Sequence, residues 1–140
     1  MTKTPINILL IEDDPGDIEL TKESLHESGL NIQLSVVDNG IAAMDYLHKR
    51  GTYADAVMPD LILLDLNLPG KDGRQVLSEV KKEHALREIP VIALTTSDAD
   101  EDITETSGLG CNCYLVKPKS YSEYARIIQV IEDFIAGYIT

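Results

Sequence analysis

Carboxylates follow two apolar runs of this sequence. The run LILL ends in Asp65, with Asn67 two positions later, and the run INILLI ends in Glu12 and Asp13. Two carboxylates about 4 Å apart repel each other by roughly 4 kcal/mol at an effective dielectric constant of about 20. Such a group therefore takes up a proton or binds a cation. Several hard oxygen ligands favour Mg²⁺, which keeps some of its own waters and pairs with phosphate.

A hydroxyl group and a lysine follow two later apolar runs. Thr95 ends the run PVIAL, and Lys117 ends the run CYLV. Mg²⁺ and Lys117 would neutralise the charge on a phosphoryl group, to which Thr95 could donate a hydrogen bond. Carboxylates form aspartyl phosphates, so Asp65 is the predicted nucleophile. Taken singly, each residue also fits a cap, a strand position or a solvated surface, but their joint placement favours a phosphoryl site.

A parallel sheet would bring these residues together. Near-continuous apolar runs predict strands covered on both faces, and the helical patterns between them predict a β-α unit repeated five times. The sequence thus predicts a doubly wound α/β fold with right-handed crossovers and helices on both faces. In such sheets ligands bind outside the carboxyl ends of the strands, where all these polar residues stand. The predicted strands span 6–11, 32–38, 61–65, 90–95 and 113–118.

The helices that join the strands carry start and stop signals. Asp14 is a predicted cap, Pro15 suits the first helical turn, and Gly29 is a predicted stop. The later helices are predicted after the turn Asn39–Gly40, over 73–82, over 97–108, and from a capping box formed by Ser120 and Glu123.

Length and charge limit the classes of function. The chain has 140 residues, which predicts a single domain over 1–140. Its 24 acidic and 12 basic residues give a formal net charge of -12, which disfavours direct nucleic-acid binding because that binding depends on Lys and Arg neutralising phosphates. No apolar run approaches the roughly 20 residues of a membrane span, and the N-terminus lacks the pattern of a signal peptide. Cys111 and Cys113 are the only cysteines. They predict a reducing compartment without a disulfide framework, so we expect a cytoplasmic protein.

Four motifs, IEDD, DLNLPGKDG, ALTT and YLVKP, resemble those of the receiver domains of two-component response regulators. The resemblance extends over about residues 8–135 and implies a flavodoxin-like fold with strand order 2-1-3-4-5 and five helices. It implies that Asp65 is the phosphoacceptor for a histidine kinase or phosphotransfer protein, in a Mg²⁺-dependent reaction. The resemblance also implies metal binding by Glu12, Asp13, Asp65 and the backbone carbonyl of Asn67. The other implied roles are charge neutralisation by Lys117 (followed by Pro118, commonly through a cis bond) and switching by Thr95 and Tyr114.

Other features refine this resemblance. Leu68 stands where many receivers have Met. The loop HKRGTYADAVMPD is longer than in minimal receivers. Together with EDDPGD and LTTSDADED, it is similar to single-domain regulators that partner phytochrome-type histidine kinases. The last helix carries more apolar residues than one packed stripe needs, which predicts a homodimer through the fourth helix, fifth strand and fifth helix. With no effector domain expected, phosphorylation would act by switching protein–protein contacts.

Two other functions fit parts of the pattern. An aspartyl-nucleophile phosphatase of the haloacid dehalogenase type needs a second acid two residues after the nucleophile, but Asn67 stands there. A degenerate receiver would use the fold as a scaffold without phosphorylation, although the complete set of Asp65, Thr95 and Lys117 argues against it. We therefore expect a receiver that phosphorylates and dephosphorylates itself, and not an enzyme that turns over external substrates.

Overall fold

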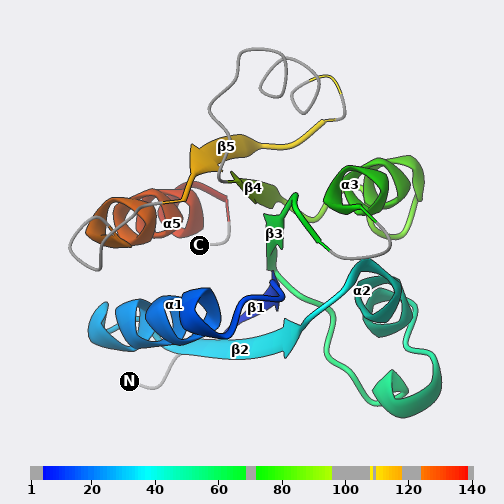
Figure 1. Cartoon of the computed structure of the whole chain (residues 1–140), viewed down its shortest axis with the longest axis horizontal. Helices are drawn as coiled ribbons and strands as arrows, with labels where there is room; N and C mark the ends of the chain where they lie inside the picture. The colour runs from blue at the N-terminus through cyan, green and yellow to red at the C-terminus, as the bar shows by residue number, and fades with distance from the viewer. Residues whose placement is uncertain (1–4, 69–71, 96–107, 109, 118–123, 139–140) are drawn as a thin grey trace.

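Five parallel strands form one sheet in the order β2-β1-β3-β4-β5 (Figure 1). The computed structural model describes residues 5–68, 72–95, 108, 110–117 and 124–138. The sheet and its order confirm the predicted fold class. The strands are β1 (Ile6–Ile11), β2 (Ile32–Val37), β3 (Leu61–Asp65), β4 (Val91–Thr95) and β5 (Cys113–Val116). Their bounds agree with the predicted ranges to within two residues, and β1 and β3 agree at both ends.

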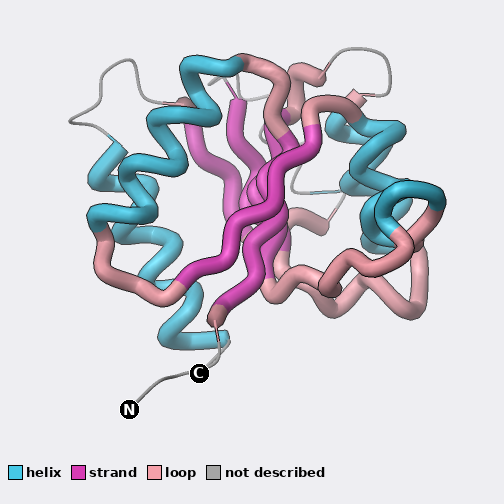
Figure 2. Tube along the Cα trace, turned by 90° about the horizontal axis from the view of Figure 1, so that it is seen from below, coloured by secondary structure: helices cyan, strands magenta, loops and turns pink. Residues whose placement is uncertain are grey.

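Helices cover both faces of the sheet, as Figure 2 shows from below. In Figure 1, α1 (Pro15–Glu27) and α5 (Tyr124–Tyr138) lie on the left of the sheet, and α2 (Gly40–Leu47) and α3 (Gly73–Lys82) lie on the right. A 3-10 turn, η1 (Gly51–Tyr53), interrupts the long loop before β3. Three predictions lie outside the described residues: the helix over 97–108, apart from Gly108, the capping box of Ser120 and Glu123, and the peptide bond to Pro118.

Side chains that fit the helix ends explain where two helices begin. The Asp14 carboxylate accepts a hydrogen bond from the backbone N–H of Asp17 at 2.9 Å, which confirms Asp14 as the cap of α1. Asn39 caps α2 in the same way by accepting from the N–H of Ala42 at 2.7 Å. Each cap satisfies a donor that the first helical turn cannot pair internally.

The predicted stop of α1 is also confirmed. Gly29 follows the last residues of the helix with a φ of 78°, in the left-handed region where a glycine is favoured.

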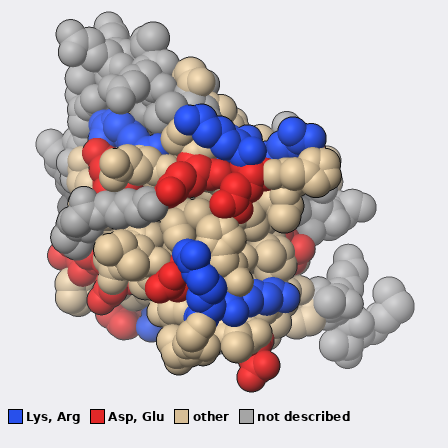
Figure 3. Space-filling view, turned by 90° about the vertical axis from the view of Figure 1, so that its right-hand side faces the viewer, with Lys and Arg blue, Asp and Glu red and all other residues tan. Residues whose placement is uncertain are grey.

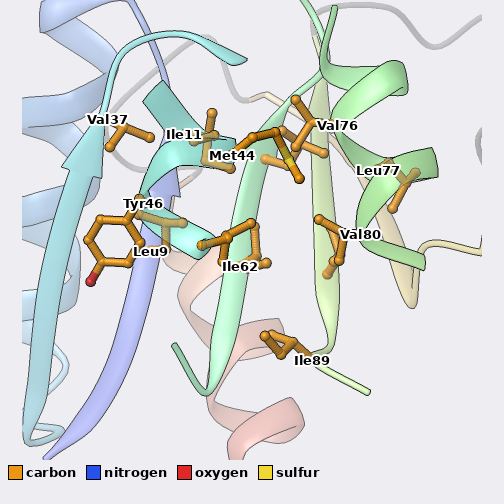
Figure 4. Close-up of a cluster of buried hydrophobic side chains, with 14 of the residues drawn as sticks. Leu9, Ile11, Val37, Met44, Tyr46, Ile62, Val76, Leu77, Val80 and Ile89 are labelled. Atoms are coloured by element: carbon orange, nitrogen blue, oxygen red, sulfur yellow. The ribbon is translucent and has the colours of Figure 1, made fainter. Parts of the chain in front are cut away.

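The core has two layers, one on each face of the sheet. Alternate side chains of β1 point to opposite faces, so Leu9 and Ile11 pack toward α2 and α3 while Ile8 and Leu10 pack toward α1 and α5. Figure 4 shows the layer beneath α2 and α3. Burial on both faces explains why β1, β3 and β4 appear as nearly unbroken apolar runs in the sequence.

The flank formed by α2 and α3 carries mixed charge (Figure 3). Lysine and arginine side chains lie beside acidic ones, and ion pairs join Arg50 to Asp45 at 3.1 Å and Arg87 to Glu88 at 4.0 Å. Such exposed pairs contribute little to stability. Within the described residues, no helix is both long and apolar enough to span a membrane.

Candidate functional site

Three carboxylates meet at the carboxyl edge of the sheet. One oxygen from each of Glu12, Asp13 and Asp65 lies within 4.8 Å of the other two. They meet because β1 and β3 are neighbours in register, with Ile11 beside Leu64, so the residues that follow these strands lie side by side. Glu12 and Asp65 are 2% exposed, whereas Asp13 is exposed to solvent. The group therefore offers hard oxygen ligands with an open side for water, an arrangement that suits a divalent cation.

Lys117 brings a positive charge to this edge. It follows β5, and its Nζ lies 2.6 Å from Glu12 Oε2, 3.0 Å from Asp17 Oδ2 and 3.2 Å from Asp65 Oδ2. Burial by itself would lower the pKa of Lys117. The hydrogen bonds to Glu12 and Asp17 and the charge of Asp65 outweigh burial and raise that pKa, so the ammonium stays charged.

The raised pKa of Glu12 indicates an excess of buried negative charge at this edge. Burial raises the pKa of the Glu12 carboxyl to about 7, against the opposing hydrogen bonds from Lys117 and from the N–H of Asp14. The nearby charge of Asp65 contributes to this rise in the same direction as burial. A bound cation would relieve this excess of negative charge.

Both oxygens of the Asp65 carboxylate have partners. Oδ1 accepts a hydrogen bond from the backbone N–H of Asn67 at 2.9 Å, and Oδ2 faces Lys117. The carboxylate is therefore held in one orientation at the end of a fully buried strand. The arrangement provides a nucleophile with a fixed position beside a cation and an acidic group.

The start of α3 packs against the backbone of Asp65. A Cβ added at Gly73 would clash with the carbonyl oxygen of Asp65 and would lie 2.6 Å from the Cα of Leu66. Asp72 and Gln75 form a capping box that fixes this helix start. Gly73 is thus required by close approach, a role that the sequence pattern alone did not assign to it.

Thr95 and Tyr114 share a face of the sheet. Tyr114 lies beside Ala93 in the register of β4 and β5, and Ala93 and Thr95 are two residues apart on one strand. Thr95 is fully buried, and its Oγ1 lies 3.2 Å from Nδ2 of Asn67. Tyr114 is partly buried against the core beneath α2 and α3. The predicted switch residues are therefore on the same side, with Asn67 between Asp65 and Thr95.

The structure adds two residues that sequence reasoning did not assign to the site. Asp17, in the first turn of α1, contacts Lys117, and the Tyr124 hydroxyl donates to Asp17 Oδ1 at 3.4 Å. Asp17 was detectable in principle, because the first turn of a helix after β1 must lie near the carboxyl edge. Tyr124 belongs to the apolar pattern of the last helix, and nothing in its spacing indicates a polar contact.

Known proteins resemble this chain over nearly all of its length. A family model described as the response regulator receiver domain matches residues 8–129. Response regulator Rcp1 of Synechocystis sp. is 43% identical over 136 residues, which cover 97% of this chain and 92% of Rcp1.

Solved structures of response regulators also match this chain over most of its length. The phosphorylated cyanobacterial phytochrome response regulator RcpA matches with a TM-score of 0.89 and 42% identity, covering 98% of this chain and 96% of RcpA. A Mn²⁺-bound form of response regulator Rcp1 matches with a TM-score of 0.86 and 43% identity, covering 93% of this chain and 94% of that one. The resemblance therefore includes the strands that carry the site.

Proposed function

Because the chain belongs to the response regulator receiver family, we propose that Asp65 accepts a phosphoryl group from a phosphohistidine on a histidine kinase or phosphotransfer protein. One observation carries the proposal: the Asp65 carboxylate lies beside those of Glu12 and Asp13 and faces Lys117, whose Nζ is 3.2 Å from Oδ2. A carboxylate oxygen attacks phosphorus, the P–N bond of the phosphohistidine breaks, and its electron pair returns to the imidazole. Lys117 stabilises the charge on the phosphoryl oxygens.

We propose Mg²⁺ as the cation of this site. Glu12, Asp13 and Asp65 offer oxygens that fit it, and the backbone carbonyl of Asn67 would complete the ligand set. When bound, the ion supplies charge neutralisation for the phosphoryl oxygens. The Mn²⁺-bound form of Rcp1 supports a divalent cation in a related protein.

We propose that Thr95 and Tyr114 form the switch. The hydroxyl of Thr95 moves toward the dianionic phosphoryl group, and Tyr114, on the same face of the sheet, turns into the space that it leaves. Thr95→Ala is expected to accept phosphate but to lose most of the response of its partners. Equal partner binding by the phosphorylated variant and the phosphorylated wild type would contradict this coupling.

A phytochrome-type kinase is the proposed phosphoryl donor. RcpA is a phytochrome response regulator, and a further match, at a TM-score of 0.85 and 34% identity, is a response regulator in red light signaling of R. palustris. The kinase, and not this chain, would sense light. Faster phosphoryl transfer from a phytochrome-type kinase than from an unrelated histidine kinase would support the assignment, and equal rates would contradict it.

We further propose a homodimer through α5, β5 and the segment 97–108. In the described part, β5 is an edge strand with Val116 43% exposed, and Val130 and Phe134 of α5 are only partly buried. A monomeric mass in light scattering, with and without phosphate, would contradict this dimer. Both cysteines are free thiols, which fits the proposed cytoplasmic location.

The alternative is a scaffold that uses this fold without phosphorylation. Intact mass spectrometry after incubation with Mg²⁺ and acetyl phosphate separates the two functions, with Asp65→Asn as the control. A receiver gains one phosphoryl group in the wild type and none in the variant. It would not turn over an external substrate, because the acceptor is its own side chain. A folded wild type that gains no mass would favour the scaffold.

A further inference from the structure

A carboxylate outside the acidic group holds the lysine of the site. Asp17 Oδ2 lies 3.0 Å from Nζ of Lys117, while Oδ1 of the same carboxylate accepts the Tyr124 hydroxyl at 3.4 Å. Asp17 therefore connects the lysine that follows β5 with the first described turn of α5. Within the described residues, this is a continuous chain of polar contacts from Asp65 through Lys117 and Asp17 to Tyr124.

The position of Asp17 suits a fixed anion. Its backbone N–H is bonded to the Asp14 cap, and its carbonyl oxygen accepts the hydroxyl of Thr21 at 2.8 Å. The N-terminus of a helix favours negative charge, so the helix stabilises the Asp17 carboxylate. Asp17 does not belong to the group of oxygens that fits the metal. Its carboxylate thus remains available to Lys117 whether or not a cation occupies Glu12 and Asp65.

Tyr124 is placed to register a change at Asp17. Its side chain is 3% exposed and packs in the core layer of α1 and α5, together with Ile127 and Leu25. A buried hydroxyl that loses its acceptor must find another or move, because an unpaired polar group is costly to bury. Through the contact between Tyr124 and Asp17, a movement of Lys117 would therefore alter the packing of the first described turn of α5.

A phosphoryl group on Asp65 would compete with Asp17 for Lys117. The new group brings additional negative charge and strong acceptor oxygens to the edge at which Nζ already lies. We propose that Asp17 positions Lys117 in the unphosphorylated protein, and that the shift of Lys117 toward the phosphoryl group is transmitted through Asp17 and Tyr124 to α5. This inference rests on the proposed function of Asp65. It identifies Asp17 and Tyr124 as positioning residues, in a route separate from Thr95 and Tyr114.

The first test needs no phosphate. Unfolding by urea without metal is measured for the wild type, Asp17→Asn, Lys117→Gln and the double variant. If Asp17 positions Lys117, the two changes are coupled by at least about twofold in the unfolding equilibrium constant, as is usual for residues in contact. Glu19→Gln with Lys117→Gln is the matched control: Glu19 is exposed on the same helix and its carboxylate lies 3.9 Å from Lys22. Additive effects of Asp17→Asn and Lys117→Gln would overturn the inference.

The second test follows α5 by amide hydrogen exchange, with Mg²⁺ and beryllofluoride as the phosphoryl mimic. In the wild type we expect the mimic to change exchange in the first described turn of α5 by at least about twofold. Asp17→Asn and Tyr124→Phe are expected to remove most of that change. The change in exchange that the mimic causes in β4, which carries Thr95, should remain. Tyr53→Phe, which alters a partly buried tyrosine of the core layer beneath α2 and α3, is the control.

The outcomes separate this inference from the proposed function. Phosphoryl uptake by the wild type with no change at α5, or with the same change in Asp17→Asn and Tyr124→Phe, overturns the route through Asp17 and leaves Asp65 as the acceptor. Failure of the wild type to take up a phosphoryl group overturns both.

Discussion

Two lysines at opposite ends of the sheet have different partners. Lys81, in the last turn of α3, donates to the carbonyl oxygens of Arg87 and Ile89 and to Oδ1 of Asn112, at 3.2, 2.9 and 3.2 Å. These acceptors precede β4 and β5, at the amino edge of the sheet, and all are neutral. Lys117, at the carboxyl edge, faces three carboxylates among the described residues.

The two edges differ in the same way for carboxylates. At the amino edge, Asp60 accepts the backbone N–H of Asn7 at 2.9 Å, so a neutral backbone donor satisfies it. At the carboxyl edge, Glu12 and Asp65 are almost fully buried beside one another. Burial of charge is expensive, and a fold gains little stability from it. The amino edge therefore holds the elements together, whereas the carboxyl edge keeps charges that only a function explains.

The pKa values of the two lysines follow their partners. Burial lowers the pKa of Lys81, with Glu88 opposing it. For Lys117, burial is outweighed by the carboxylates and the pKa is raised. The pKa values of the two lysines thus differ in direction because Lys81 donates to neutral acceptors and Lys117 faces carboxylates.

Exchanging each lysine for methionine should give the largest contrast. Lys117→Met leaves Glu12 and Asp65 without their cation, so we expect a loss of about 3–5 kcal/mol in the free energy of unfolding. Phosphoryl transfer should fall by about 100-fold or more, because a charged donor to the phosphoryl oxygens is lost. Lys81→Met should lose about 1–3 kcal/mol and keep phosphoryl transfer. Urea unfolding and the rate of phosphorylation by acetyl phosphate are measured for both variants. Equal losses of the phosphorylation rate in Lys117→Met and Lys81→Met would contradict the difference between the two edges.

Gly73 tests how firmly α3 positions Asp65. Gly73→Ala places a Cβ against the backbone of Asp65 and Leu66, so we expect a loss of about 1–3 kcal/mol and slower phosphorylation. Gly137→Ala is the matched control, because a Cβ there has no atom within 4 Å among the described residues and alanine favours a helix. Thermal and urea unfolding provide the measurement. A Gly73→Ala protein as stable as the wild type would show that the helix start can shift freely.

Mg²⁺ should stabilise the carboxyl edge without affecting the amino edge. A cation that binds only the folded state, at a concentration about 100 times its dissociation constant, raises the free energy of unfolding by about 2.7 kcal/mol. We expect Asp13→Asn to weaken this stabilisation and Asp60→Asn to leave it unchanged. Thermal unfolding over a Mg²⁺ series measures the effect, and a Mg²⁺ response that survives in Asp13→Asn would remove that residue from the ligand set.

The smallest predicted effect concerns Tyr124 at high pH. Burial and the charge of Asp17 raise the pKa of Tyr124 to about 12, from an ordinary value of 10.0. Its stabilising contribution is fully present below pH 10 and is lost as the pH rises toward 12, because the unfolded chain ionises first. Stability should therefore fall by about 2 kcal/mol more in the wild type than in Tyr124→Phe across that interval. Identical pH profiles in urea unfolding would contradict the raised pKa of Tyr124, and with it the buried position of the hydroxyl beside Asp17.

Much of the fold was predictable because the central strands β1, β3 and β4 are largely buried on both faces. The limits of β3 and α3 followed from the apolar run that ends at Asp65 and from the amphipathic pattern after Gly73. The acidic group and Lys117 were also predictable, since parallel strands bring their carboxyl ends to one edge. The sequence pattern did not identify Asp17, Tyr124 or the close approach at Gly73. The contact of Tyr124 and the close approach at Gly73 depend on how α5 and α3 pack against the sheet, which residue spacing does not encode. The place of Asp17 in the first helical turn after β1, by contrast, already put it near the carboxyl edge.

The central claim is that Asp65 is the residue modified at the carboxyl edge. The most direct measurement is reductive trapping: the protein is treated with Mg²⁺ and acetyl phosphate, reduced with borohydride and mapped by peptide mass spectrometry. Reduction of an acyl phosphate converts aspartate to homoserine, so the account predicts homoserine at position 65 alone. Homoserine at another position, or none in a folded protein, would contradict it.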